Sequence, residues 1–209
     1  MEKKHVTVAG NIGAGKSSLT RVLSDYFGWK AFYERVEDNP YLEDFYDDMR
    51  RWSFNLQVFF LSNRFRQRHL IDETPRSVVQ DRSIYEDAEI FARNLHDMDL
   101  MSDRDYANYR ELYESMLDRL RAPDLLIYLR ASVSTLVDHI EGRGRGYEDS
   151  IQIDYLRRLK RRYETWIDGY ALGPKMIIEV DAYDFVNNDD DYRAVIDQVE
   201  SRLFGLFPE

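Results

Sequence analysis

A glycine-rich loop near the start of the chain places the strongest constraint on the fold. Residues 10–17 read GNIGAGKS, which matches the phosphate-loop pattern G-x-x-x-x-G-K-S. A β-branched run at 6–8 precedes the loop, and apolar residues at helical spacing (Leu19, Val22 and Leu23) follow it. A strand, a tight loop and a helix in this order let backbone N–H groups converge on phosphate oxygens at a helix N-terminus. The sequence therefore predicts a nucleotide-phosphate site.

The lysine and the serine of this loop have separate predicted roles. Lys16 is expected to bridge the outer phosphates, and Ser17 is expected to ligate Mg²⁺. A glycine-rich turn that fits the pattern by chance is the alternative, and the strand before it and the helix after it argue against that alternative. The predicted nucleotide contacts are Gly10, Asn11, Ile12, Gly13, Ala14, Gly15, Lys16, Ser17 and Ser18.

Composition limits the class of protein. The 209 residues, 44% of them hydrophobic, suit a single domain over 1–209 with a real core. There is no cysteine for a disulfide or a thiolate zinc site, the N-terminus is polar, and no run of about 18 apolar residues occurs. We therefore expect a cytoplasmic protein without membrane contact. The net charge of −10 argues against a general nucleic-acid surface, so an anionic ligand must meet locally concentrated cations.

Strand and helix patterns alternate along the chain. Short apolar runs suited to buried parallel strands occur at 6–9, 31–33, 77–80, 125–129 and 176–180, and longer amphipathic stretches at 52–70 and 106–120 are typical of helices. This alternation predicts an α/β fold with three layers around a parallel sheet. In such sheets ligands bind beyond the carboxyl ends of the strands.

Charged residues stand at two of these predicted strand ends. Glu34 follows the second strand, where a carboxylate is a suitable acceptor for a hydroxyl proton. Asp81 closes the third strand in the manner of a Walker-B acid suited to Mg²⁺, and the adjacent Arg82 can reach a transferring phosphoryl group. A solvated charge at Glu34 and a surface ion pair at 81–82 remain as the structural alternatives.

The segment EGRGRGYEDS at 141–150 predicts a lid. Its glycines alternate with Arg143 and Arg145, which makes a poor helix interior but a good flap over about 142–150. Alternating arginines can clamp phosphate oxygens, and closure would exclude water as a competing phosphoryl acceptor. A solvated basic turn is the alternative.

Five motifs in order resemble the deoxynucleoside kinases that act on deoxyadenosine, deoxyguanosine or deoxycytidine. They are the phosphate loop, ERVEDNPYLEDFY, RRWSFNLQVFFLSNRF, QDRSIYEDAEIFARNL, and RGRGYE leading to YLRRLKRRYETWI. The resemblance runs over nearly the whole chain. It implies a P-loop kinase fold with a five-stranded parallel sheet, helices on both faces and a short arginine-containing lid. It also implies transfer of the ATP γ-phosphoryl to the 5′-hydroxyl of a deoxyribonucleoside, with Mg²⁺.

The resemblance also implies roles for individual residues. Glu34 would be the general base, with Arg82 beside it, and Arg143 and Arg145 would be lid residues that contact ATP. The remaining substrate contacts would be Tyr46 and Glu148 at the 3′-hydroxyl, Gln57 at the base edge, and Arg64 and Asp87 in the rest of the base pocket. Gln57 and Arg64 are seven residues apart, hence on one helix face and about 10.5 Å apart along the axis. Without the resemblance, this face would be interpreted as core with two polar residues.

The chain departs from the family pattern at two positions. His139 stands where family lids carry an additional arginine, so one phosphate contact would be weaker or pH-dependent. Asp81 stands where many animal relatives have glutamate, which bears on whether the Mg²⁺ contact is direct or through water.

Several alternatives stay open. A nucleoside monophosphate kinase should place cations, not Glu34, at the second strand end, and a GTP-dependent switch protein would need an N-K-x-D string that the chain lacks. A nucleotide-binding module without catalysis is separable only by assay. The amide of Gln57 favours deoxyadenosine, with a deoxyguanosine-preferring kinase as the alternative. The family likeness further suggests a homodimer joined through helices and feedback by a deoxynucleoside triphosphate.

Overall fold

The structure is a computed structural model that describes residues 2–34, 39–118, 120–145 and 151–205. Five parallel strands form one sheet in the order β2-β3-β1-β4-β5. Each strand begins and ends within one residue of its predicted bounds, which confirms the predicted five-stranded α/β sheet. The strands are β1 (His5–Gly10), β2 (Lys30–Phe32), β3 (Val78–Asp81), β4 (Leu125–Arg130) and β5 (Lys175–Glu179).

The two predicted amphipathic helices are present with shifted ends. The helix predicted at 52–70 runs over Met49–Glu73, because the Asp48 side chain accepts from the Arg51 N–H and caps it. The one predicted at 106–120 starts earlier, at the Ser102 cap, and ends at Leu117. The helices are α1 (Lys16–Phe27), α2 (Leu42–Asp47), α3 (Met49–Glu73), α4 (Ile84–Glu86), η1 (Asp87–Ala92), α5 (Arg93–Asp97), α6 (Asp103–Leu117), α7 (Val133–Arg143), α8 (Ile153–Asp168), η3 (Val180–Ala182) and α9 (Asp189–Phe204).

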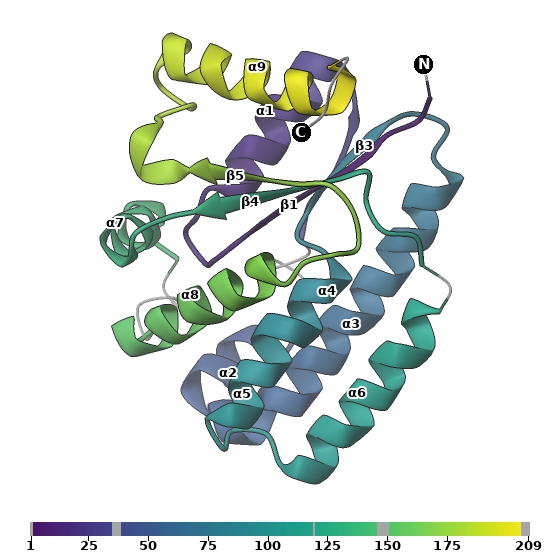
Figure 1. Cartoon of the computed structure of the whole chain (residues 1–209). Helices are drawn as coiled ribbons and strands as arrows, with labels where there is room; N and C mark the ends of the chain where they lie inside the picture. The colour runs from purple at the N-terminus through teal and green to yellow at the C-terminus, as the bar shows by residue number, and fades with distance from the viewer. Residues whose placement is uncertain (1, 35–38, 119, 146–150, 206–209) are drawn as a thin grey trace.

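Helices cover both faces of the sheet. In Figure 1, α1 and α9 lie on one side of the strands, and α3, α4, α6 and α8 lie on the other. The side chains of β4 alternate between the two layers: Leu125, Ile127 and Leu129 pack with α1 and α9, whereas Leu126 and Tyr128 pack with the opposite helices. This explains why the strand has a continuous apolar sequence, since both of its faces are buried.

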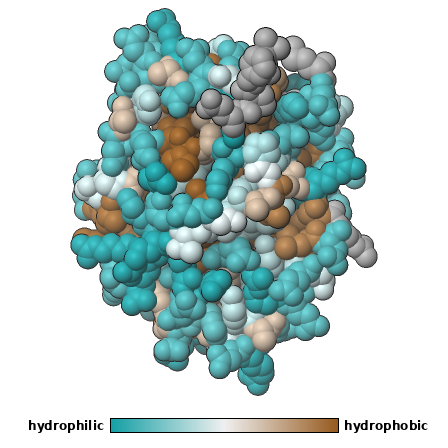
Figure 2. Space-filling view, viewed as in Figure 1, coloured by the Kyte–Doolittle hydropathy of each residue, from teal (hydrophilic) through white to brown (hydrophobic). Residues whose placement is uncertain are grey.

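A third apolar cluster contains helical residues alone. Leu61 on α3 packs with Ile84 on α4 and with the fully buried Tyr109 and Tyr113 on α6. The face of the molecule seen in Figure 2 is mainly hydrophilic, with hydrophobic residues in separate patches. In the described part of the chain, every helix is too short or too polar to span a bilayer.

The acidic segment at 187–191 starts the last helix. The Asn188 side chain accepts from the N–H groups of Asp190 and Asp191, and three aspartates occupy the first turn of α9. Carboxylates stabilise this end of a helix because the helix dipole is positive there. The acidic run therefore has a local structural role.

A buried histidine on β1 joins the sheet to α3. His5 is 8% exposed, its Nδ1 lies 2.8 Å from the Arg68 guanidinium, and its Nε2 lies 3.0 Å from the Gln80 side-chain oxygen. Because a guanidinium can only donate, Nδ1 must accept, so the proton of the neutral ring is on Nε2. Burial, and secondarily the charge of Arg68, lower the pKa of His5 from 6.5 to about 4. The folded protein therefore prefers the neutral ring.

This preference predicts a pH dependence of stability. The unfolded chain binds a proton at His5 below about pH 6.5 and the folded chain does so only below about pH 4, so the free energy of unfolding should fall as the pH falls through this window. The expected loss is on the order of 3 kcal/mol between pH 7 and pH 4. Urea titrations across this range should show a shallower decrease for His5→Gln than for wild type.

The exposed His69 on α3 provides the matched control. His69→Gln should follow the wild-type pH profile, and a His5→Gln profile as steep as that of wild type would contradict the assignment.

Candidate functional site

The phosphate loop joins β1 to α1 as predicted. Gly13 and Gly15 have φ values of +81° and +87°, and a Cβ on Gly13 would lie 2.6 Å from the Leu136 carbonyl oxygen of α7. Only glycine avoids both the strain and the clash at Gly13. Within the described chain, α1 starts without a side-chain cap and without an acidic residue in its first turn. Its first backbone N–H groups are therefore available to an anion.

Lys16 is buried at the start of α1, with 8% of its surface exposed. Its Nζ donates to the Asn11 carbonyl oxygen at 2.8 Å, which holds the side chain back over the loop. Burial, and then the nearby Arg82, lower the pKa of Lys16 to about 8, against the opposing effect of Asp81 and Glu34. A bound polyphosphate would favour the charged lysine, so the site is electrostatically prepared for an anion.

Ser17 and Asp81 meet at the same strand edge. Val8 of β1 pairs with Asp81 of β3, and the Ser17 hydroxyl donates to Asp81 Oδ2 at 2.5 Å. Asp81 is 2% exposed, and among the described residues its Oδ1 is buried without a hydrogen-bond partner. No three acidic or histidine side chains cluster for a metal in the described ranges. The hydroxyl and the carboxylate fit a Mg²⁺ ion whose other ligands come from phosphate and water.

Glu34 lies just beyond β2 and is held by cations. Its Oε1 accepts from Arg64 Nη2 at 2.7 Å and lies 3.7 Å from Arg82 Nε. Burial alone would raise the pKa of Glu34, but Arg82, Arg64 and Lys16 together lower it to about 2. Its side chain keeps 17% exposure and lines a cavity. The structure therefore places an ionised carboxylate, not a solvated surface charge, at this strand end.

Arg82 adopts an unusual backbone conformation at the carboxyl end of β3. Its φ is +66°, in the left-handed region that costs a non-glycine residue about 1–2 kcal/mol. The backbone N–H of Arg82 donates to the Val8 carbonyl, and its guanidinium lies 4.3 Å from the centroid of the Phe91 ring. Such strain persists where the surrounding contacts hold it, and these contacts direct the side chain into the cavity.

Glu86 is a buried residue that the sequence analysis did not identify. It is fully buried, and it accepts hydrogen bonds from Tyr163, Ser83 and Gly10. Burial raises the pKa of Glu86, with Arg82 opposing the rise. The S-x-x-E spacing of Ser83 and Glu86 is the pattern of a capping box, which the structure contains. That pattern could have predicted the cap, but not the contacts with Gly10 and Tyr163.

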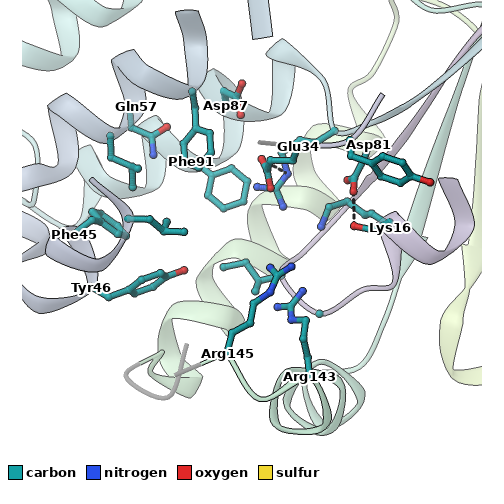
Figure 3. Close-up of a pocket in the computed structure, with 18 of the residues that line it drawn as sticks. Lys16, Glu34, Phe45, Tyr46, Gln57, Asp81, Asp87, Phe91, Arg143 and Arg145 are labelled. Carbon is teal, nitrogen blue, oxygen red and sulfur yellow. Dashed lines mark hydrogen bonds and ion pairs between the residues drawn. The ribbon is translucent and has the colours of Figure 1, made fainter. Parts of the chain in front are cut away.

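A cavity of about 500 Å³ opens beside Glu34. Figure 3 shows Gln57, Phe45 and Tyr46 at the end away from Lys16, with Phe91 between them and Glu34. Gln57 is 2% exposed, and its Oε1 is buried without a hydrogen-bond partner in the described part of the structure. An aromatic chamber with one unsatisfied acceptor is suited to a flat polar ring.

The structure separates Arg64 from Gln57, although the sequence places them on one helix face. Both are buried on α3, but Arg64 does not appear in the described cavity lining. Its guanidinium donates to Glu34, to Asp87 at 3.2 Å and to the Asp81 carbonyl at 3.0 Å. Asp87 does line the cavity. Arg64 therefore orients carboxylates around the cavity.

A second cavity of about 760 Å³ lies on the other side of the phosphate loop, between α7 and residues 180–187. The two cavities share Gly13, Lys16, Ser17, Arg143 and Arg145. In Figure 3, Arg143 and Arg145 point from the α7 side toward Lys16 and Glu34. Two ligands could thus meet end to end at the loop, with cations around the junction.

The predicted lid begins differently from the expectation. Gly142 and Arg143 belong to the last turn of α7, and the helix ends at Gly144, which has φ +63°. One glycine in a last turn is tolerated, so the alternating glycines do not prevent helix there. Arg145 follows Gly144 and lines both cavities, and the remainder of the predicted lid, including Glu148, falls in the segment 146–150 outside the described residues.

His139 contacts the phosphate loop. Its Nδ1 lies 2.8 Å from the Gly13 carbonyl oxygen, so Nδ1 carries the proton and donates. The sequence also did not identify the aromatic walls formed by Phe45, Phe60, Phe91 and Tyr155. The many aromatic residues in 41–60 were the available indication, but aromatic residues at helical spacing are more often core.

The chain matches a sequence profile described as "Deoxynucleoside kinase" over residues 6–203. It is 41% identical to deoxyadenosine/deoxycytidine kinase of Bacillus subtilis (strain 168), covering 94% of this chain and 91% of that one. It is 44% identical to deoxyguanosine kinase of Lactobacillus acidophilus, covering 95% of this chain and 90% of that one.

Solved structures agree with the fold. Deoxyadenosine kinase from M. mycoides, solved with the products dCMP and a flexible dCDP, superposes with a TM-score of 0.84 at 27% identity, over 94% of this chain and 99% of that one. The same kinase with bound dATP gives a TM-score of 0.83 at 27% identity, over 95% and 100% of the two chains. The profile match, these identities and the similar fold show that the chain belongs to the deoxynucleoside kinase family.

Proposed function

We propose that this deoxynucleoside kinase transfers the γ-phosphoryl group of ATP to the 5′-hydroxyl of deoxyadenosine in preference to other deoxynucleosides, in nucleotide salvage. The observation that carries the proposal is the junction of the two cavities at Lys16 and Ser17, with the Glu34 carboxylate on the acceptor side. A carboxylate there suits a hydroxyl acceptor and repels an acceptor phosphate. This argues against a nucleoside monophosphate kinase.

Glu34 is the proposed general base. Its three neighbouring cations keep it ionised, so it can accept the hydroxyl proton at neutral pH. In a loose phosphoryl transfer the hydroxyl loses its proton late, when it has become more acidic, so a weak base is sufficient. Lys16 and Arg82 both lie close to Glu34 and would stabilise the charge that develops on the transferred group.

ATP is the proposed phosphoryl donor, and Mg²⁺ is the proposed metal ion. The phosphate loop, Arg143 and Arg145 would hold the triphosphate, while Ser17 and the unpartnered Oδ1 of Asp81 fit the metal. When bound, Mg²⁺ neutralises phosphate charge. Tyr46 and Glu148 remain proposed contacts of the 3′-hydroxyl. Tyr46 lines the acceptor cavity.

The base preference rests on the unpartnered amide oxygen of Gln57. This oxygen needs a donor, and adenine and cytosine both present an exocyclic amine beside a ring acceptor that can pair with the Gln57 amide nitrogen. Guanine presents O6 and N7, two acceptors, and would leave the amide oxygen without a partner. Arg64 could donate to O6, but it is engaged by Glu34, Asp87 and the Asp81 backbone. The relatives include both deoxyadenosine and deoxyguanosine kinases, so their names do not decide the base.

We also propose that the protein is a homodimer that pairs through α3 and α6. These helices contact each other, and Leu112 of α6 is 39% exposed. Phe54, Val58 and Phe65 of α3 are only partly buried. An apolar helix pair of this kind supports an interface between copies.

Lys16→Ala should abolish turnover and leave the fold intact, because the lysine neutralises charge on the transferred phosphoryl group. Steady-state phosphorylation assays and circular dichroism of the purified variant check both parts. The exposed Lys30→Ala is the control and should retain wild-type turnover. A folded Lys16→Ala variant with wild-type activity would contradict the phosphate-loop assignment.

Glu34→Gln should lower kcat by about 10²- to 10⁴-fold with a smaller change in ATP affinity, because the amide keeps the size of the side chain but not its basicity. The exposed Glu43→Gln is the matched control. A change confined to KM would assign Glu34 to binding. Since the pKa of Glu34 is about 2, the wild-type rate should also show no loss from Glu34 protonation between pH 5 and 8.

Competition among the four deoxynucleosides at equal concentration tests the base preference. We expect deoxyadenosine to be consumed first, then deoxycytidine, then deoxyguanosine, with thymidine last. Gln57→Leu should reduce the preference for deoxyadenosine over thymidine by roughly tenfold to a hundredfold in kcat/KM. Asn63→Leu, on the same helix but not in the described cavity lining, should leave the order unchanged. If deoxyguanosine is consumed first, the deoxyadenosine preference inferred from Gln57 is wrong.

A further inference from the structure

A further hollow, of about 460 Å³, lies between α5 and α8, away from the two cavities at the phosphate loop. The two helices lie side by side in Figure 1. Four arginines line the hollow, and we call it the arginine pocket: Arg93, Arg158, Arg161 and Arg162. Its described lining shares no residue with either cavity at the phosphate loop. The volume is close to that of the proposed nucleoside cavity, so the hollow has room for a nucleotide-sized ligand.

The helix geometry brings these arginines together. Arg158, Arg161 and Arg162 have i, i+3, i+4 spacing, which places them on one face of α8, and Arg93 faces them from the first residue of α5. The chain as a whole has 39 acidic and 29 basic residues. Four guanidinium groups around one hollow therefore form a locally basic site on a chain whose net charge is −10.

The charges of this pocket are only partly neutralised by protein. Arg162 pairs with Asp97, Arg158 pairs with Asp154 at 3.0 Å, and the lining residue Glu89 is engaged by Arg110 at 2.6 Å. Among the described residues, Arg93 and Arg161 have neither a hydrogen bond nor an ion pair from their side chains. Arg93 and Arg161 therefore have their guanidinium donors available, and they lie beside Arg158 and Arg162, which ion pairs already orient. A guanidinium group can donate two parallel hydrogen bonds to two oxygens of one phosphate.

The pocket is connected to the nucleoside cavity through the buried Asn94. Arg162 Nε donates to Asn94 Oδ1 at 3.2 Å, and Asn94 is 1% exposed. Burial raises the pKa of Tyr155, and the nearby Asn94 side chain opposes that rise; Tyr155 in turn lines the cavity beside Glu34. A ligand that draws Arg162 toward it would change this chain of contacts.

We propose that the arginine pocket binds an oligophosphate anion, such as a triphosphate chain, and that its occupancy alters nucleoside binding through Arg162, Asn94 and Tyr155. The half-buried Trp166 and the Thr165 hydroxyl also line the pocket and could contact a nucleoside attached to the phosphate chain. The ligand is either an inorganic oligophosphate or the triphosphate of a nucleotide, and the two sources share the same recognition by guanidinium groups.

Calorimetry on the full chain at constant ionic strength tests the binding. In the Lys16→Ala background, which weakens the phosphate loop, inorganic triphosphate should still bind at about one site per chain. Adding Arg93→Ala and Arg161→Ala should weaken that binding at least tenfold. The control adds Arg104→Ala and Arg157→Ala, an equal charge change at exposed positions outside the described lining, and should retain the site.

Each outcome decides the proposal. Equal affinity for inorganic triphosphate and for dATP would show that the pocket recognises the phosphate chain. Tighter binding of dATP would show that the pocket also contacts the nucleoside. Either result supports the proposed pocket. Absence of binding in the Lys16→Ala background would overturn it. An equal loss of triphosphate affinity in the control variant would show that the effect comes from overall charge, and this too would overturn the proposed pocket.

The connection to the active site has its own measurement. At saturating MgATP, inorganic triphosphate should change the KM for deoxyadenosine in wild type, and Arg93→Ala/Arg161→Ala should remove that change while keeping the basal rate. Competition at the phosphate loop would affect both proteins equally. An identical response of the two proteins would refute the connection, and it would leave the proposed kinase activity untouched.

Discussion

The burial of Glu34 among Arg64, Arg82 and Lys16 is the interaction on which the rest of the site depends. A carboxylate taken out of water is stable only with partners, and removing one partner of a buried ion pair typically costs about 3–5 kcal/mol. The three cations come from α3, the end of β3 and the start of α1. The fold must therefore bring these three elements together before the carboxylate can be ionised in the cavity.

The sheet order provides that meeting point. β1 lies between β3 and β4, so the phosphate loop after β1 has the Asp81–Arg82 end of β3 on one side and the α7 side of β4 on the other. The connection after β1 leads to β2 on one side of the sheet, and the connection after β3 leads to β4 on the other side. Open α/β sheets form a crevice at the carboxyl edge where the strand order reverses in this way. The proposed acceptor and donor cavities occupy the two sides of this crevice and share the loop. The meeting of the two cavities at one loop thus follows from strand order.

Structural support for the site comes from residues that do not face a ligand. Glu86 connects Gly10, Ser83 and Tyr163, and Arg64 connects Glu34 with Asp87. Their hydrogen bonds fix Asp81 and Ser83 on either side of Arg82, and they position the Glu34 and Asp87 carboxylates. Preorganised charges of this kind can stabilise a transition state without rearrangement during the reaction. Asn94 has a similar position between the cavity and the arginine pocket.

The sequence by itself determined the features that depend on neighbouring residues. The phosphate loop, the five apolar strands and the charged residues at strand ends were predictable, because glycine conformation, strand burial and helix capping are encoded within a few positions. Tertiary structure decided what those residues touch. It separated Arg64 from Gln57, extended α7 through Arg143, and placed Glu86 against Gly10, 76 positions away. It also gave Glu34 its low pKa, because the cations that cause it are distant in the sequence and only the packed sheet brings them within reach.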